Sequence, residues 1–490
     1  MNDTAKLEIS VLAVAITLGV LGDSLLRCFP WGVNFAIWGT LLAGAIYFLG
    51  RSRRQAFAGG AFCLVLPMVL SPLAFLWHDS PPLEALNLLA LLTALSLVIL
   101  RAYGGRLRMA SLMQYALGSV LAGLNATLGM FPLLLKDREW TSALGGGQIR
   151  KTLAVLIGLA LAIPPLLVFG ALFMGADAVF RAIVVRFLRD VPSHLVLIGF
   201  ITYFVGGYLR GLLLGKERIT KSVERLLPIS LGAIETGVMM GALDLLFLAF
   251  VAVQVRYLFG GSSLVLATTG LSYAEYARRG FFELIAVVAL VLPLLLFVHW
   301  LLRPDDATGQ RLFRWLAGAQ IALLFVIMAS AVERMRLYQA EYGLSEQRLY
   351  PTAFMGWLAA VFVWFCLTVL RGHREQFAFG AMVAGFLLIA TLHVINPDAL
   401  IARTNLARGR AGRNFDARYA ANLSADAVPE LLAGLPDLNP LDRCTLATRL
   451  LARWPPAESP DWRSWSYSRS RARQAISANF PTLREACPHK

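Results

Sequence analysis

The stretch ETGVMMGALDLLFLAFVAVQVRY at residues 235–257 decides the class of this protein. As an α-helix it would extend about 34 Å, enough to cross a hydrocarbon core about 30 Å thick. Asp244 lies well inside the stretch, where inserting a carboxylate costs roughly 2.5–3.5 kcal/mol. Each neighbouring Leu, Phe or Val offsets about 0.3–0.6 kcal/mol of that cost, so the helix can insert. We therefore expect the Asp244 carboxylate to face protein or water, not lipid.

The composition of the whole chain is that of a membrane protein. Of its 490 residues, 58% are hydrophobic and 15% are charged, with a mean hydropathy of +0.64. Soluble domains carry about 25% charged residues. The net charge of +15 comes from arginines in loops and the tail, which suits contact with a lipid bilayer that contains anionic lipids. Because no nucleic-acid-binding motif accompanies this charge, we expect no nucleic-acid partner.

Apolar segments long enough to cross a membrane recur along the chain. Hydropathy predicts about twelve of them, at residues 8–26, 31–49, 57–77, 83–100, 110–135, 151–174, 195–214, 235–257, 281–302, 315–333, 352–370 and 377–395. The predicted fold is therefore all-α. Residues 1–395 would form a polytopic transmembrane helix bundle of about twelve spans, and residues 396–490 a small soluble helical C-terminal domain.

The tail after Asn396-Pro397 has a different character, with more charge and shorter apolar runs. Gly and Pro residues divide it into three or four short helices. The alternating Arg469, Arg471 and Arg473 predict a solvated or lipid-facing helix surface. Residues expected to supply much of the core of the tail are Leu431, Leu435, Leu446, Leu450 and Trp454.

Basic loops predict the orientation at one end only. A cytoplasmic N-terminus follows from Arg51, Arg53, Arg54, Arg101, Arg106 and Arg108. Twelve spans would place the tail in the cytoplasm as well, but would put the basic residues 216–225 outside. Either one span is miscounted between residues 101 and 216 or this loop breaks the rule, so the side of the tail stays open, with parity favouring the cytoplasm. If the tail is outside, Cys444 and Cys487 are disulfide candidates, with Cα atoms within about 7 Å.

The polar loop after the deciding stretch has two interpretations. Ser272 and Glu275 fit a capping box, and Arg279 lies four residues from both Glu275 and Glu283. One interpretation is an interfacial helix held by its charges and tyrosines; the other is a gate over a cavity containing Asp244. The residues concerned are Tyr273, Glu275, Tyr276, Arg278 and Arg279.

Several short motifs carry a family resemblance. They are YLFGG at residues 257–261, YAEYARRGFFEL at 273–284, ADAVF at 176–180 and NPDALIARTNLAR at 396–408. With these motifs the chain resembles uncharacterised bacterial polytopic membrane proteins, the domain-of-unknown-function families 4153 and 4173. The resemblance covers roughly residues 18–473 and implies a multi-pass protein of the bacterial inner (cytoplasmic) membrane. It implies no particular activity.

Polar residues within the apolar segments are the candidates for a binding site. Isolated polar residues in helix bundles usually pair with another helix or a backbone carbonyl, so we expect most of them to be structural. The set is Asp23, Asn125, Asp177, Glu235, Asp244, Gln254, Glu283, Glu333 and His393. From it we take Asp244, Glu235, Glu283 and His393 as the candidate binding residues.

Enzyme signatures are missing from the sequence. It contains no H-E-x-x-H, G-x-S-x-G or phosphate-loop motif, and its cysteines are scattered. We therefore assign no catalytic residue, metal or cofactor. The favoured function is non-enzymatic, either transport or permeation, or sensing or assembly with a protein partner bound by the C-terminal domain. The alternative is a membrane-embedded transferase or hydrolase that uses intramembrane carboxylates.

Overall fold

The computed structural model describes residues 3–51, 61–135, 162, 166, 168–190, 193–215, 231–259, 281–303, 305–455 and 461–487. In these ranges every element is helical, apart from one isolated bridge between Leu231 and Leu302. Nine of the helices in these ranges are long and apolar enough to cross a membrane. The prediction of an all-helical membrane protein is confirmed. The chain divides into two compact units, one of Met1–Thr220 with Ala457–Ser470 and one of Lys221–Pro456 with Arg471–Lys490.

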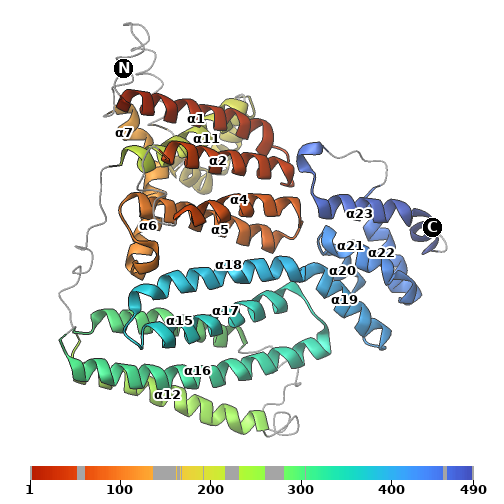
Figure 1. The fold of residues 1–490 in the computed structure, drawn as a ribbon. Coiled ribbons are helices and arrows are strands. Elements are labelled where there is room, and N and C mark those ends of the chain that lie inside the picture. The colour runs from red at the N-terminus through yellow and green to blue at the C-terminus, as the bar shows by residue number, and fades with distance from the viewer. Residues whose placement is uncertain are drawn as a thin grey trace. The chain divides into compact units, whose positions relative to one another are not determined.

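The first unit is built from helices that lie side by side (Figure 1). Such apolar helices satisfy their own backbone hydrogen bonds. Where α2, η2 and α5 meet, the ring centroids of Phe35 and Phe75 lie 4.5 Å apart. The elements of this unit are α1 (Asp3–Leu26), α2 (Val33–Gly50), η1 (Ala61–Leu64), α4 (Val65–Leu73), η2 (Ala74–Leu76), α5 (Pro81–Ala102), η3 (Leu107–Met109), α6 (Leu112–Leu128), α7 (Met130–Leu135), α10 (Ala178–Asp190), α11 (Ser193–Leu214) and η8 (Trp462–Ser464).

Helices α1 and α11 pack against each other in antiparallel directions. Just beyond the end of α1, Arg27 donates a hydrogen bond to Ser193, the first residue of α11, over 2.9 Å. Further back along α1, a Cβ atom at Gly206 would lie 3.3 Å from the Cβ of Ala15. The chain therefore leaves α11 at the end of the unit where α1 begins.

A buried asparagine organises the connection between α1 and α2. Asn34 has no exposed surface. Its side-chain oxygen accepts hydrogen bonds from the amides of Gly32 and Phe35, and its side-chain nitrogen donates to the carbonyls of Leu25 and Cys28. One side chain thus satisfies backbone groups at both helix ends, which the helices themselves cannot pair.

Residues 461–470, called the C-terminal segment below, pack against this connection within the first unit. The amide of Val33 donates a hydrogen bond to the carbonyl oxygen of Trp465 over 2.9 Å. Gly32 permits the approach, because a Cβ atom at that position would lie 2.2 Å from the same oxygen. A backbone contact this close requires glycine.

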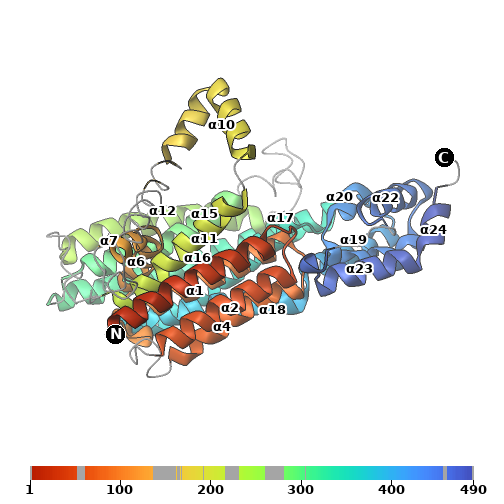
Figure 2. The same ribbon diagram turned by 90° about the horizontal axis from the view of Figure 1, so that it is seen from above.

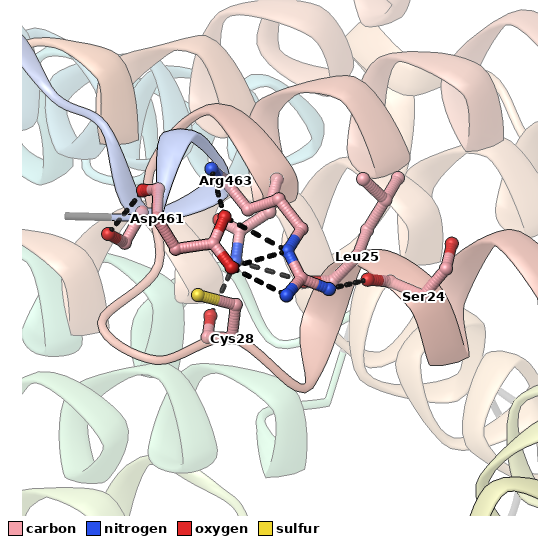
Figure 3. A network of polar contacts seen from close by, with 7 residues as sticks. Ser24, Leu25, Cys28, Asp461 and Arg463 are labelled. Atoms are coloured by element: carbon pink, nitrogen blue, oxygen red, sulfur yellow. Dashed lines mark hydrogen bonds and ion pairs between the residues drawn. The ribbon is translucent and has the colours of Figure 1, made fainter. Parts of the chain in front are cut away.

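Two arginines fasten the C-terminal segment. Arg463 donates to the carbonyl of Ser24 over 2.6 Å and forms an ion pair with Asp461, as Figure 3 shows. Arg469 is 6% exposed, and its Nη1 lies 3.4 Å from Oδ1 of Asp79. The expectation that Arg469 lies on a solvated or lipid-facing surface is wrong. Its guanidinium is buried because Asp79, from the connection before α5, supplies the opposite charge that burial demands.

The second unit has its own apolar core, in which Phe281, Phe313 and Phe362 are almost fully buried. Its longest helix, α16, has 36 residues, so it would extend about 54 Å and project beyond a hydrocarbon core of about 30 Å. The long helices of the unit are α12 (Ala233–Phe259), α15 (Phe281–Leu301), α16 (Ala307–Tyr342), α17 (Glu346–Thr368) and α18 (Phe377–Ile395), and η5 (Arg374–Gln376) precedes α18.

The tail begins at Asn396, which adopts the left-handed conformation (φ 52°) between α18 and α19. Asparagine tolerates that conformation better than most residues. Short helices follow, grouped at the ends of α17 and α18 (Figure 2). They are α19 (Pro397–Arg410), α20 (Ala417–Asn422), η6 (Ala425–Ala427), α21 (Val428–Ala433), η7 (Leu435–Asp437), α22 (Pro440–Arg453), α23 (Tyr467–Ala478) and α24 (Phe480–Glu485).

The tail helices share one hydrophobic cluster. The five residues predicted for its core are all buried there: Leu431, Leu435, Leu446, Leu450 and Trp454. Cys444 and Cys487 form a disulfide with a Cα–Cα distance of 4.8 Å. The boundary between a bundle ending at residue 395 and a separate domain starting at residue 396 stays a prediction, because the two compact units divide the chain elsewhere.

Three predicted spans have no counterpart among the long helices of the described ranges. The first, 57–77, contains the shorter apolar helix Val65–Leu76. The second, 110–135, contains α6, which has 17 residues and runs across α5 rather than along it (Figures 1 and 2). The third, 151–174, falls largely outside the described residues. The predicted gate residues Tyr273, Glu275, Tyr276, Arg278 and Arg279 lie entirely outside them.

Candidate functional site

Helices α12 and α16 run parallel to each other and keep a constant register. A Cβ atom at Gly237 would lie 2.9 Å from Leu312. Further along, the side-chain oxygen of Gln254 accepts a hydrogen bond from Ser330 over 3.0 Å. By subtraction the two pairs have sequence offsets of 75 and 76 residues. A residue of α12 between these two contacts therefore lies at the same level as the residue of α16 whose number is 75 or 76 higher.

Asp244 lies level with Gln320 by this register. Both carboxylate oxygens of Asp244 and both polar side-chain atoms of Gln320 are buried and have no hydrogen-bond partner among the described residues. The hydroxyl of Thr236, about 12 Å earlier along α12, is also buried without a hydrogen-bond partner among the described residues. A buried polar group without a partner costs roughly 1–3 kcal/mol, and an ionised carboxylate costs more. The Asp244 carboxyl group is therefore suited to hold a proton or a small cation.

Further polar groups lie at the far end of the same helix pair. Gln254 comes about 15 Å after Asp244 and is 7% exposed. Its side-chain oxygen accepts a second hydrogen bond, from Arg334 over 2.7 Å. We call these polar residues of α12 and α16 the polar line; they are Thr236, Asp244, Gln320, Gln254, Ser330 and Arg334.

The structure does not bring the four candidate binding residues together. Glu235 lies in the first turn of α12, where its carboxylate accepts a hydrogen bond from the amide of Gly232 over 3.0 Å. Glu283 lies in the first turn of α15. The other end of α15 meets the start of α12, where the amide of Leu231 donates a hydrogen bond to the carbonyl of Leu301. Glu235 and Glu283 are thus at opposite ends of the helices, and both are exposed.

His393 lies in the last turn of α18 and is half-buried. It belongs to the end of the bundle from which the tail helices start. Of the four candidates, only Asp244 is a member of the polar line.

Other polar residues of the apolar segments do have partners. Asp23 pairs with Arg27 over 2.6 Å and with His194 over 2.7 Å. Asn125 donates a hydrogen bond to the hydroxyl of Tyr103 over 3.0 Å. These residues have the structural role expected of isolated polar groups in a bundle. Asp244 differs from them because its oxygens are buried without a partner among the described residues.

Sequence reasoning missed Gln320 and Thr236. Gln320 is the only amide or charged side chain between Arg314 and Glu333, so the signal that identified Asp244, a polar residue inside an apolar run, was present. Within the described ranges no three His, Cys, Asp or Glu side chains lie together as metal ligands.

Comparisons with known proteins identify the family. Neither the curated proteins nor the solved structures contain a match to this chain. The family model described as "Domain of unknown function (DUF4153)" matches residues 62–434, a range that contains α12, α16 and the first helices of the tail. This match covers well over half of the sequence and agrees with the motifs that carry the resemblance, so the chain belongs to the DUF4153 family.

Proposed function

We propose that this protein moves protons or small monovalent cations across the membrane, with Asp244 as the binding group. One observation carries the proposal. The carboxyl group of Asp244 and the amide of Gln320 are both buried without partners among the described residues, level with each other on two parallel helices long and apolar enough to span. Polar residues with a structural role in a helix bundle ordinarily have hydrogen-bond or ion-pair partners.

The chemistry of the pair fits a small cationic substrate. A protonated Asp244 is neutral and stable at hydrocarbon depth, whereas its charged form requires water or a counter-ion. Gln320 offers one acceptor and two donors, so its amide can accept from the acid or add an oxygen ligand to a cation. The neighbouring members of the polar line are about 12 and 15 Å away along the helix. Since hydrogen bonds reach only about 3 Å, water molecules would have to bridge these intervals.

A membrane-embedded transferase or hydrolase is the weaker alternative. Such chemistry requires a nucleophile or a second acid–base group within hydrogen-bond reach of the first. In the described part of the chain, neither carboxylate oxygen of Asp244 has a hydrogen-bond partner. Sensing or assembly through the tail remains a second candidate, favoured by the docking of the C-terminal segment on the α1–α2 connection.

The orientation that we propose has the N-terminus in the cytoplasm of a bacterium whose inner membrane holds the protein. Because α11 is antiparallel to α1, α11 ends where α1 begins, and the basic stretch 216–225 comes next in the sequence. Tyr103, which follows the basic end of α5, donates to the carbonyl of Gly211 over 3.1 Å at this same end. Described helix ends that are followed in the sequence by basic residues thus share one end of the unit, which supports its cytoplasmic location and suits contact with anionic lipids.

We further propose eleven membrane crossings and an extracytoplasmic tail. Nine long helices, the shorter Val65–Leu76 and the apolar stretch 151–174 make eleven, and α6 is left out because it is short and runs across α5. An odd number puts the two ends of the chain on opposite sides. The C-terminal segment supports this count, since it contacts the end of α1 opposite the N-terminus. The disulfide of the tail also favours an oxidising compartment.

The test is proton flux into liposomes that contain the purified protein and a trapped pH-sensitive dye. With a pH gradient imposed and the membrane potential clamped, the wild type should acidify the interior, and Asp244→Asn should reduce the rate to that of protein-free liposomes. Glu375→Gln, an exposed carboxylate in η5, is the matched control and should keep the wild-type rate. If Asp244→Asn transports protons, sodium and potassium ions as the wild type does, the proposal is wrong.

A further inference from the structure

We propose that the C-terminal segment is anchored in the phospholipid headgroup region of the bilayer by a belt of exposed aromatic side chains. The belt lies where the first four apolar helices of the unit end or begin, at the connections between α1 and α2 and between η2 and α5. Its rings are between 44% and 76% exposed. The belt residues are Phe29, Trp77, Trp462, Trp465 and Tyr467.

The outer surface of α4 leads directly to this belt. Exposed leucines at positions 66, 70 and 73 follow one another at helical spacing, and Trp77 continues the same series beyond η2. A stripe of exposed leucines on a helix of this composition faces hydrocarbon. Trp77 therefore stands where the stripe passes from hydrocarbon into the headgroup region, the position in which tryptophan is enriched.

The C-terminal segment is held by contacts at the same end of the helices as Trp77. The ring centroid of Tyr467 lies 5.8 Å from that of Trp77. Arg463 donates to the carbonyl of Ser24, within one turn of the end of α1, and the carbonyl of Trp465 accepts from the first residue of α2. If α1 and α2 cross the membrane, these contacts set the segment at the hydrocarbon boundary.

The exposed rings indicate lipid as the partner. Tryptophan and tyrosine combine an apolar ring with a polar N–H or O–H group, and they are most stable where one side is apolar and the other is wet. Charges on the segment are already paired, since Arg463 binds Asp461 and Arg469 lies beside Asp79. Recognition would therefore come from burial of the rings among headgroups and acyl-chain ends, not from attraction to a particular anionic lipid.

The anchoring does not depend on the transport proposed above. Only the choice of leaflet, the extracytoplasmic one, rests on the proposed orientation. The depth of the rings is a separate quantity, and it can be measured whichever side the segment occupies.

Depth-dependent quenching of tryptophan fluorescence tests the proposal on the full-length protein in bilayers. Two lipids are compared, one brominated near the headgroup end of its acyl chains and the other near the terminal methyl groups. Subtracting the emission of the double variant Trp462→Phe/Trp465→Phe from that of the wild type gives the emission of these two residues. Trp454→Phe provides a control for a tryptophan that is 7% exposed and packed in the tail cluster.

We expect the subtracted emission of Trp462 and Trp465 to be quenched more strongly by the shallow bromines than by the deep ones, and that of Trp454 by neither. Quenching only by a water-soluble quencher, or mainly by the deep bromines, would overturn the proposal. Protection from all of these quenchers would also overturn it, because the rings would then be covered by a second copy or another protein. Should the double variant fail to fold, Trp77→Phe gives the same comparison at the neighbouring position.

Discussion

The backbone amide of Val33 donates a hydrogen bond to the carbonyl oxygen of Trp465 over 2.9 Å, so the start of α2 is completed by the end of the chain. Synthesis proceeds from the N-terminus, and the whole second unit lies between these two residues apart from its last stretch, Arg471–Lys490. The first helix pair must therefore wait for the C-terminal segment before its connection is fully packed. Substitutions in the α1–α2 connection or in the C-terminal segment should therefore both change the stability of the first unit.

Replacing Gly32 by alanine should destabilise the first unit. The new Cβ atom would lie 2.2 Å from the Trp465 oxygen and 2.8 Å from a guanidinium nitrogen of Arg469, so the C-terminal segment would have to shift. Overpacking of this kind costs roughly 1–3 kcal/mol. Thermal unfolding in detergent should show a lower midpoint for Gly32→Ala than for Gly44→Ala, because a Cβ atom at Gly44 meets no atom within 4 Å. Equal midpoints would contradict the close contact.

Acid should loosen the C-terminal segment through Asp461. Hydrogen bonds from Arg463 lower the pKa of Asp461 to about 2, against about 3.9 for aspartate in an unfolded chain. A depressed pKa means that the ionised carboxylate stabilises the folded state above about pH 3.9 and that this contribution is lost as the pH falls towards 2. The unfolding midpoint of the wild type should exceed that of Asp461→Asn at pH 6, and the difference should vanish near pH 2. A difference that does not change with pH would contradict the role of this ion pair.

Insertion energetics alone predicted that the Asp244 carboxylate avoids lipid, and its buried oxygens agree with that argument. What the sequence did not reveal is which residue lies level with it. Gln320 lies level with Asp244 because α12 and α16 are parallel with a constant offset, and register between helices leaves no trace in hydropathy. Arg469 is a similar case, since its partner Asp79 comes from the opposite end of the chain. The alternation of arginines with small residues predicted a solvated helix surface, because a local sequence pattern carries no information about a charged residue far away in the sequence.

The span count illustrates a different difficulty. Hydropathy measures apolar length but not direction, so residues 110–135 looked like a crossing, whereas α6 within them has 17 residues and runs across α5. One such segment changes the parity of the whole chain. The eleven crossings that we propose leave this segment out, which would remove the conflict between the basic stretch 216–225 and a count of about twelve, and the antiparallel packing of α1 and α11 supports that proposal.

Reduction of the Cys444–Cys487 disulfide should destabilise the tail. The bond links residues 43 positions apart, and a loop of that size contributes roughly 4 kcal/mol through the entropy of the unfolded chain. Under denaturing conditions, maleimide should label two more cysteines after reduction than before it. The double variant Cys444→Ser/Cys487→Ser should match the reduced protein in stability and show no increase in labelling. Full labelling without reductant would contradict the bond.

The last prediction concerns the side of the membrane on which the tail lies. A C-terminal segment held at the end of α1 opposite the N-terminus, together with a disulfide, favours the extracytoplasmic side. Alkaline phosphatase, which folds only where disulfides form, should therefore be active when fused after Lys490. Fusion after Gly215, at the end of α11 that we propose to be cytoplasmic, should give inactive enzyme of similar abundance. The reciprocal pattern is expected for green fluorescent protein, with fluorescence after Gly215 and none after Lys490 when export uses the unfolded chain.

Active phosphatase at both positions would place α11 in the opposite direction, and inactive phosphatase after Lys490 would require an even number of crossings. In the second case the C-terminal segment would have to lie on the cytoplasmic side, although it contacts the end of α1 opposite the N-terminus.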